Sequence, residues 1–249
     1  MKCRTLKWLA AALLAGICAL GLLPGGEARA DEAQPGALHL SANVGLTSNY
    51  IFRGITQSNN GAAIQGGFDV TNGWLYAGAW GSNVDFGAAI PNADLELDLY
   101  GGVRPVIGST TFDAGFIYYK YPDAKSSYHL DYYEFYGGLT EDFHFVQLGA
   151  KVFYTPEDTL KTKSAWYYEA NANVPIPLQL RFVKQAALTA HIGHYKFSSN
   201  RAAGPDYTDW RVGGQVDTGP VTLGLAYGDT DRDRAHDDKV WVTLSHTFN

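Results

Sequence analysis

Cysteine is nearly absent from this sequence. It has only two cysteines, Cys3 and Cys18, and both lie within the first thirty residues. If those residues are removed on export, the remaining chain enters an oxidising compartment without a disulfide. Its stability must then come from another source. A closed β-sheet is one such source, because all of its backbone groups pair within the sheet.

The first thirty residues have the three parts of a secretory signal peptide, namely a basic start, an apolar run and a small-residue cleavage motif. These parts are Lys2, Arg4 and Lys7, then Trp8 to Leu23, then Ala28-Arg29-Ala30. We therefore expect residues 1–30 to be a cleaved Sec-type signal and residues 31–249 to be one domain. An uncleaved N-terminal anchor is the alternative. A lipoprotein signal is excluded because Ile17, before Cys18, is not small.

Long apolar runs and basic residues are also scarce. After residue 31, no stretch approaches the ~18 apolar residues that a membrane helix needs. Without the signal, the basic residues fall from 19 to 15 and the acidic residues from 25 to 24, a net charge of −9. This balance argues against nucleic acid as a partner. The chain is 14% aromatic and has 28 glycines. Membrane barrels cross with weak segments of ~10 alternating residues, which hydropathy misses.

Apolar residues at every second position are the dominant pattern of the chain. From Leu38 to Thr47, one face reads Leu, Leu, Ala, Val, Leu and the other reads His, Ser, Asn, Gly, Thr. Such alternation predicts strands with one apolar and one polar face. About twelve segments show it, beginning near Leu38, Ala62, Trp74, Asp94, Thr110, Leu130, His144, Ser164, Ala186, Tyr207, Val221 and Lys239.

Short and long links alternate between these segments. Asn72-Gly73 and Gly219-Pro220 are tight hairpin turns, whereas polar loops such as Asn49 to Asn60 are longer. Outer-membrane barrels have this asymmetry, with short periplasmic turns and long outer loops. Pro175 to Lys184 is an exception, since a short turn is expected there. The sequence predicts an all-β fold, a transmembrane antiparallel β-barrel of about 12 strands in a closed up-and-down meander.

The chain ends in a strand with an apolar face. Val240, Val242, Leu244 and Phe248 share that face, and Asn249 follows the aromatic residue. This ending resembles the insertion signal of outer-membrane proteins and predicts recognition by the barrel-assembly machinery. An ordinary edge strand is the alternative.

Aromatic residues cluster where the predicted strands end. We expect most of them to form girdles at the two bilayer interfaces, with sugar-stacking platforms as the alternative. The clusters are Trp74 and Tyr76; Tyr118, Tyr119 and Tyr121; Tyr132 and Tyr133; and Trp166, Tyr167 and Tyr168.

The stretch from Thr47 to Ser58, TSNYIFRGITQS, resembles the opening motif of the TorF-type porin family, which comprises proteobacterial outer-membrane proteins formerly of unknown function. Three more stretches are similar to that family, namely Leu130 to Gly138, Tyr207 to Trp210 and Ser245 to Phe248. The resemblance spans nearly the whole chain after residue 30. It implies an outer-membrane barrel with a transport role, without an agreed substrate or established site residues.

The polar face of each strand should line the lumen of the barrel. The inward acidic candidates outnumber the basic ones by nine to three, which favours cations. The acidic candidates are Asp69, Asp94, Glu96, Asp98, Asp113, Glu134, Glu169, Asp209 and Asp217. The basic candidates are Arg104, Lys151 and Arg211, and the uncharged ones include Asn43, Gln65, Gln147, Asn171, Asn173 and Gln215. In the alternative, these charges pair across the lumen and plug it.

Pore width depends on the number of strands. About eight strands leave an interior filled by side chains and about 16 to 18 leave an aqueous channel, so twelve should pass only small solutes or be closed by a loop. The loop from Asn49 to Asn60 is the candidate constriction. Its Arg53 could pair with Asp98 or Glu134, or be solvated at the rim.

We therefore expect a porin-like channel for passive passage of small polar solutes, with a mild cation preference and outer-membrane lipid around it. The alternatives are a barrel enzyme acting on lipid and a plugged structural or binding barrel. No catalytic residue, metal or cofactor is predicted. His191 and His194 face opposite sides of a strand, and His129 and His144 lack a clear serine partner. A soluble periplasmic binder would not need the link asymmetry.

Overall fold

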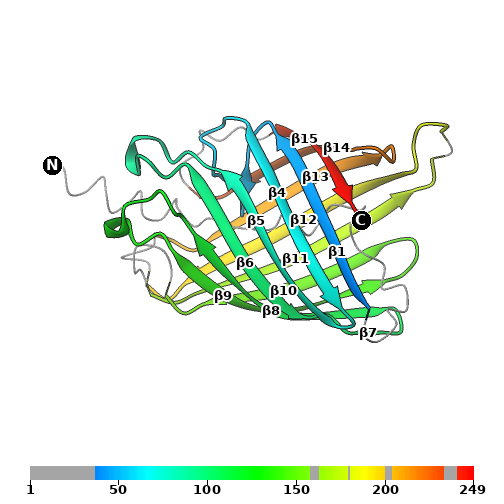
Figure 1. Ribbon diagram of the computed structural model, residues 1–249, viewed down its shortest axis with the longest axis horizontal. Helices are drawn as coiled ribbons and strands as arrows, with labels where there is room; N and C mark the ends of the chain where they lie inside the picture. Colours follow the sequence, from blue (N-terminus) through cyan, green and yellow to red (C-terminus); the bar gives the residue numbers. More distant parts are fainter. Residues whose placement is uncertain (1–36, 158–162, 179, 200–203, 233–239) are drawn as a thin grey trace.

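The computed structural model describes residues 37–157, 163–178, 180–199, 204–232 and 240–249. The expected signal peptide, residues 1–30, lies outside these ranges. Twelve antiparallel strands form one closed barrel (Figure 1), as the sequence predicts. They are β1 (Leu38–Thr47), β4 (Ala63–Asn72), β5 (Leu75–Asn83), β6 (Leu95–Val103), β8 (Thr110–Lys120), β9 (Tyr132–Asp142), β10 (Gln147–Thr155), β11 (Ala165–Ile176), β12 (Gln185–Phe197), β13 (Tyr207–Asp217), β14 (Thr222–Thr230) and β15 (Val240–Phe248).

Two pairings close the ring of strands. The first strand pairs with the last, with Ala42 opposite Phe248, and β6 pairs with β8, with Leu97 opposite Lys120. Between β6 and β8 lies the two-residue strand β7 (Val106–Ile107), which pairs only with the start of β8. Each expected strand start lies within three residues of the observed one. Closure leaves no sheet edge, so the backbone of the wall is satisfied without disulfides.

The outer surface of the barrel is apolar. On β4, Ile64 and Phe68 are 64% and 58% exposed, and every strand of the wall carries similar residues on its outer face. A belt of this size around a soluble protein would drive aggregation, whereas in a bilayer it contacts acyl chains. No helix of the described residues is long and apolar enough to cross a membrane.

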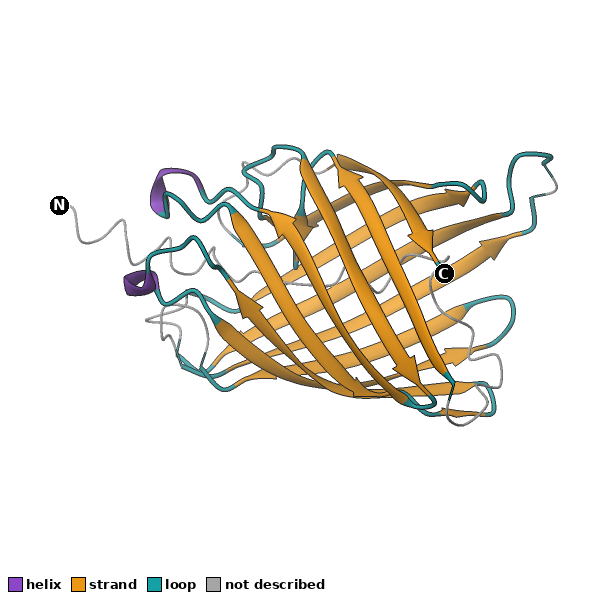
Figure 2. Cartoon of the chain, in the orientation of Figure 1, coloured by secondary structure: helices purple, strands orange, loops and turns teal. Residues whose placement is uncertain are grey.

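The links differ between the two ends of the barrel, as the sequence predicts. Gly73 and Trp74 form the two-residue link between β4 and β5, and Gly73 has a φ of 59° that suits a tight turn. The opposite end carries the longer loops, with the short 3-10 turns η3 (Gly87–Ala89) and η4 (Ser126–Tyr128) visible in Figure 2. We call the two ends the turn end and the loop end. The long link between β11 and β12 is at the turn end, where it projects beyond the barrel (Figure 1).

The interior is filled with apolar side chains at the loop end. The segment from residue 48 to 61, which we call the inward segment, packs its Tyr50 and Phe52 among wall residues, and both are buried. Tyr50 meets Trp80 of β5 edge to face, with 5.7 Å between ring centroids. On the opposite wall, Ile55 packs with Phe153 and Tyr195. The inward segment therefore bridges the lumen.

The expected aromatic girdle is only half correct. Trp74, Tyr133, Trp166 and Tyr168 are exposed on the outer surface, and Tyr118 also faces outward, between the buried Ile117 and Tyr119. Five other tyrosines of the same clusters point inward, because neighbouring residues of a strand face opposite sides. The inward five are Tyr76, Tyr119, Tyr121, Tyr132 and Tyr167. For these the girdle prediction is wrong.

Candidate functional site

A small hairpin forms the tip of the inward segment. Its strands are β2 (Ile51–Phe52) and β3 (Ile55–Thr56), and Arg53 and Gly54 make the turn with φ values of 45° and 77°. Side-chain bonds hold the base of the hairpin, where Asn49 Nδ2 donates to Asn60 Oδ1 at 2.9 Å. Short polar side chains that bond to nearby backbone favour such a turn over a continued strand.

The tip fits closely against the barrel wall. A Cβ added to Gly54 would come within 2.6 Å of Asp209 Cβ and 3.0 Å of Thr230 Cβ. A side chain at this position would collide with β13 and β14, and the left-handed backbone would add strain. Glycine therefore allows the tip to approach the wall and Arg53 to reach its position.

Arg53 forms a bidentate ion pair with Glu134 of β9. Its Nη1 and Nη2 donate to the two carboxylate oxygens at 2.9 and 2.8 Å. The two side chains are 2% and 0% exposed. Glu134 also accepts from Tyr119 Oη at 2.9 Å and from Thr155 Oγ1 at 2.7 Å. Both oxygens of the carboxylate are thus satisfied, as a buried charge requires.

Aromatic rings surround the Arg53 guanidinium. Its central carbon lies 4.1 Å from the ring centroid of Tyr167, 4.9 Å from that of Phe153 and 5.1 Å from that of Tyr195. Phe52, at 4.6 Å, belongs to the inward segment itself. Ring faces attract a cation, so these contacts offset part of the lost hydration. We call Glu134, Phe153, Tyr167 and Tyr195 the cation seat.

The cation seat keeps Arg53 charged. Burial lowers the pKa of the guanidinium, but the Glu134 carboxylate and the hydrogen bonds to it raise it more. The net result is a pKa well above the ordinary value of arginine. Arg53 is therefore a permanent cation in the lumen.

Two further carboxylates lie at the loop end of the lumen. Glu96 and Asp98 face inward from β6 and are fully buried. Among the described residues, neither forms an ion pair, and the side chain of Tyr121 lies beside Glu96. Tyr50 of the inward segment lies near Glu96. The inward segment therefore covers these two acidic groups.

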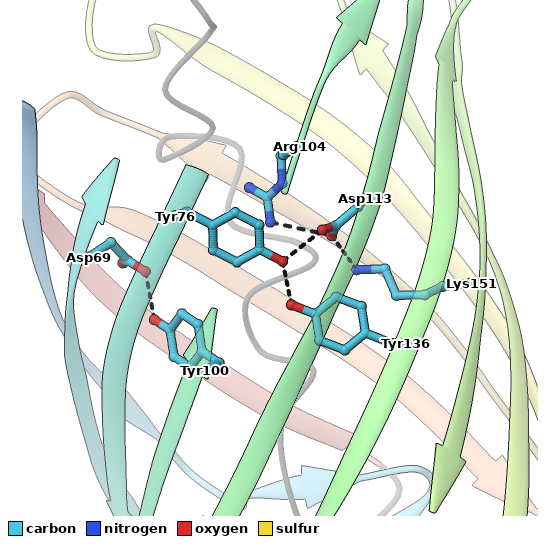
Figure 3. A network of polar contacts seen from close by, with 7 residues as sticks. All are labelled: Asp69, Tyr76, Tyr100, Arg104, Asp113, Tyr136 and Lys151. Carbon is cyan, nitrogen blue, oxygen red and sulfur yellow. Dashed lines mark hydrogen bonds and ion pairs between the residues drawn. The ribbon is translucent and has the colours of Figure 1, made fainter. Parts of the chain in front are cut away.

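The turn end of the lumen carries a connected polar network (Figure 3). Asp113 of β8 accepts from Tyr76 Oη at 2.7 Å and from Lys151 Nζ at 2.9 Å. The 50% exposed Arg104 reaches the same carboxylate at 3.4 Å and lies over the Tyr76 ring. Tyr136 contacts the Tyr76 hydroxyl. Opposite charges thus pair along the wall between nearby strands here, which differs from the predicted alternative of pairing across the lumen.

A histidine joins a third polar cluster on β11, β12 and β13. His191 Nε2 lies 3.1 Å from Asp209 Oδ1, and its Nδ1 lies 2.8 Å from Asn171 Oδ1. Tyr167, which belongs to the cation seat, donates to Asp209 Oδ2 at 2.9 Å. This bond fixes the orientation of the Tyr167 ring under Arg53.

A family model described as a bacterial protein of unknown function (Gcw_chp) matches residues 30–248. The chain belongs to the Gcw_chp family. The comparison with curated proteins gave no match. The TorF-type name suggested by the motifs is not confirmed by these comparisons.

Solved structures similar to this Gcw_chp chain include two porins. The KdgM porin matches with a TM-score of 0.54 and 10% identity, over 84% of this chain and 98% of that one. The NanC porin matches with a TM-score of 0.47 and 12% identity, over 84% and 98%. LpxR from Salmonella typhimurium matches with a TM-score of 0.46 and 10% identity, over 84% and 99%. The likeness to KdgM shows a porin-like barrel fold.

The residues predicted to line the lumen separate into two levels of the barrel. Glu96, Asp98 and Glu134 lie at the loop end, where the inward segment covers them. The turn-end half holds Asp69, which accepts a hydrogen bond from Tyr100 Oη at 2.6 Å. It also holds Arg104 and Lys151, each of which forms an ion pair with Asp113. Glu169 accepts from Asn171, and Gln147 donates to Asp142. Arg211 and Gln215 lie on β13, and Asp94 is exposed just before β6.

The prediction for Arg53 left three positions open, and the structure has one of them. Arg53 pairs with Glu134, not with Asp98, and is not solvated at the rim. The aromatic part of the cation seat was missed, because Tyr167 was assigned to the girdle. Strand parity alone would have placed it inside, since Tyr167 and the inward candidate Glu169 are two residues apart. Whether the predicted residues line an open passage stays a prediction.

Among the described residues, no three His, Cys, Asp or Glu side chains gather as metal ligands do. His191 faces the lumen and His194 lies outside, where its Nδ1 is 3.0 Å from Thr208 Oγ1. The two histidines are thus on opposite faces of β12, as their spacing predicts.

Proposed function

We propose that this Gcw_chp chain is an outer-membrane channel for the passive passage of small polar solutes. The observation that carries the proposal is the sidedness of the wall. The outer face is apolar, while the turn-end half of the lumen carries partly exposed charged and hydroxyl groups such as Arg104, Lys151 and Tyr76. Polar groups kept inside a lipid-embedded wall are suited to contact with water.

In this proposal the inward segment sets the width of the passage. It bridges the lumen from Trp80 on one wall to Glu134 on the other. A barrel of twelve strands is wider than the roughly eight-stranded barrels that side chains fill completely, so a segment of chain is needed to narrow it. The structure is then a narrow or closed state of the channel, and withdrawal of the inward segment widens it.

We further propose a mild preference for cations. Withdrawal of Arg53 would leave Glu96, Asp98 and Glu134 on the loop-end wall, and rings of carboxylates favour cations. At the turn end, Arg104 and Lys151 both meet Asp113, so that level contributes little selectivity. The preference therefore depends on the three loop-end carboxylates.

The remaining parts of the proposal concern how the protein reaches the outer membrane and whether it is an enzyme. A cleaved Sec-type signal at residues 1–30 and the barrel-assembly machinery would deliver the chain to outer-membrane lipid. The transport role implied by the TorF-type resemblance agrees with a channel. We propose no enzymatic activity. The lumen-facing His191 is held by Asp209, Asn171 and Tyr167 in a structural polar cluster.

Planar-bilayer recording of the refolded protein tests this proposal. We expect discrete ion-conducting steps and, in a KCl gradient, a reversal potential that shows preference for potassium. The E96Q/D98N double variant should weaken that preference. A barrel that never conducts but hydrolyses outer-membrane lipid would contradict the proposal and support the enzyme.

A further inference from the structure

The cation seat is built by the wall and not by the inward segment. Glu134, Phe153, Tyr167 and Tyr195 come from four consecutive strands, β9 to β12. Their rings pack on one another, with 5.5 Å between the centroids of Tyr167 and Tyr195 and 6.2 Å between those of Phe153 and Tyr167. Tyr195 also stacks on Phe197 at 4.5 Å. These mutual contacts keep the rings in place without Arg53.

The carboxylate of the seat is also positioned independently of Arg53. Tyr119 Oη and Thr155 Oγ1 both donate to Glu134 from the wall. A carboxylate with a planar pair of oxygens recognises a guanidinium by two parallel hydrogen bonds. Aromatic faces around it add attraction for any organic cation. The wall thus offers a preorganised guanidinium site.

The tip that fills this site holds a strained backbone. Arg53 has a φ of 45°, which a residue with a side chain rarely adopts, and it is followed by Gly54, whose φ is 77°. Strained backbone of this kind is found at ligand clamps and in switch segments. Strain in the tip lowers the free energy needed to remove Arg53 from the seat.

From these observations we propose that the cation seat is a binding site for guanidinium-bearing solutes, and that Arg53 is a tethered competitor for it. A solute that carries a guanidinium makes the same two hydrogen bonds and the same ring contacts as Arg53. When it occupies the seat, the inward segment loses its anchor and the loop end of the lumen opens. The transport consequence rests on the proposed channel, whereas the binding does not.

The seat should distinguish between classes of solute. A neutral urea lacks the charge that Glu134 and the rings attract, and a primary ammonium cannot donate the planar pair of bonds. Because the tethered guanidinium has an effective concentration in the millimolar range, a free solute must compete against it. Removal of Arg53 should therefore increase the affinity for the solute.

Chemical complementation of R53A tests the site directly. Ethylguanidinium replaces the atoms that this substitution removes, and ethylurea is its neutral control. We expect millimolar ethylguanidinium to raise the thermal unfolding temperature of refolded R53A in detergent, with no rise for ethylurea. The wild-type protein should need an ethylguanidinium concentration about tenfold higher for the same rise in unfolding temperature, because Arg53 competes for the site. R181A, which removes an arginine of the β11–β12 link, should respond as wild type does.

Two results would overturn this inference. One is an R53A protein that ethylguanidinium and ethylurea stabilise equally. The other is a response that persists in R53A/E134Q, in which the carboxylate is lost. If R53A does not refold, the R53M variant takes its place, because methionine keeps most of the apolar part of the arginine side chain. A protein that binds ethylguanidinium in detergent but never conducts would contradict the channel and leave the site standing.

Discussion

Arg53 illustrates how a buried charge is tolerated in this barrel. Two hydrogen bonds to Glu134 and three rings of the wall replace the water that the guanidinium loses. Such a pair contributes little net stability, but removal of one partner leaves the other charge buried and unpaired. The pair therefore fixes the position of the inward segment more than it stabilises the fold.

The E134Q substitution tests this pairing at nearly constant shape. It removes the negative charge and leaves Arg53 buried without a counter-ion. We expect a loss of about 3–5 kcal/mol in the free energy of unfolding, measured by urea titration of the refolded protein. D123N, in the exposed loop that follows β8, should not move the unfolding midpoint. An unchanged midpoint for E134Q would mean that Arg53 leaves the seat at no cost.

Gly54 allows a matched test of the close approach. G54A should force the tip off the wall, because its Cβ would lie 2.6 Å from Asp209 Cβ. Released Arg53 then becomes a trypsin site, so we expect cleavage after Arg53 in membrane-embedded G54A but not in wild type. G73A is the control, since Gly73 also has positive φ but nothing within 4 Å of the added Cβ. Equal protection of G54A and wild type would contradict the tight contact.

At the scale of the strand, alternation separates lipid from lumen. Leu225 lies near the middle of β14 on the outer face and is 57% exposed. A lysine there would place a charge in the hydrocarbon region. L225K should lower the free energy of unfolding in lipid vesicles by about 2–4 kcal/mol, as measured by urea titration. L225M is the control, and a neutral effect of L225K would place this face away from lipid.

Much of the element-scale structure could be predicted from the sequence. The period of two predicted the twelve strands, because each one has a lipid face and a lumen face. Turn chemistry predicted a tight turn at Asn72-Gly73, one residue before the observed link of Gly73 and Trp74. Interior contacts were harder, because alternation says which side a residue faces but not its depth. The choice of Glu134 over Asp98 for Arg53 therefore needs the three-dimensional register. For Tyr119 and Tyr167, the clustering of aromatic residues at strand ends favours a girdle, although strand parity places both side chains inside.

At the scale of the whole molecule, the barrel has two unlike halves. The loop-end half is packed around the inward segment, with Tyr50, Phe52 and Arg53 all buried. The turn-end half has a polar wall whose charges pair between strands, as Figure 3 shows for Asp113. In the proposed channel, the polar half would be the wide part of the passage and the packed half the narrow part. The proposed passage is thus controlled at one level of the lumen.

Single-channel conductance of R53A beside wild type, in the same membranes and salt, tests this account most directly. The substitution removes the anchor of the inward segment and leaves the wall of the barrel unchanged. The account predicts larger or more frequent conducting steps for R53A than for wild type. Steps of the same size and frequency in the two proteins would show that the inward segment does not control the passage.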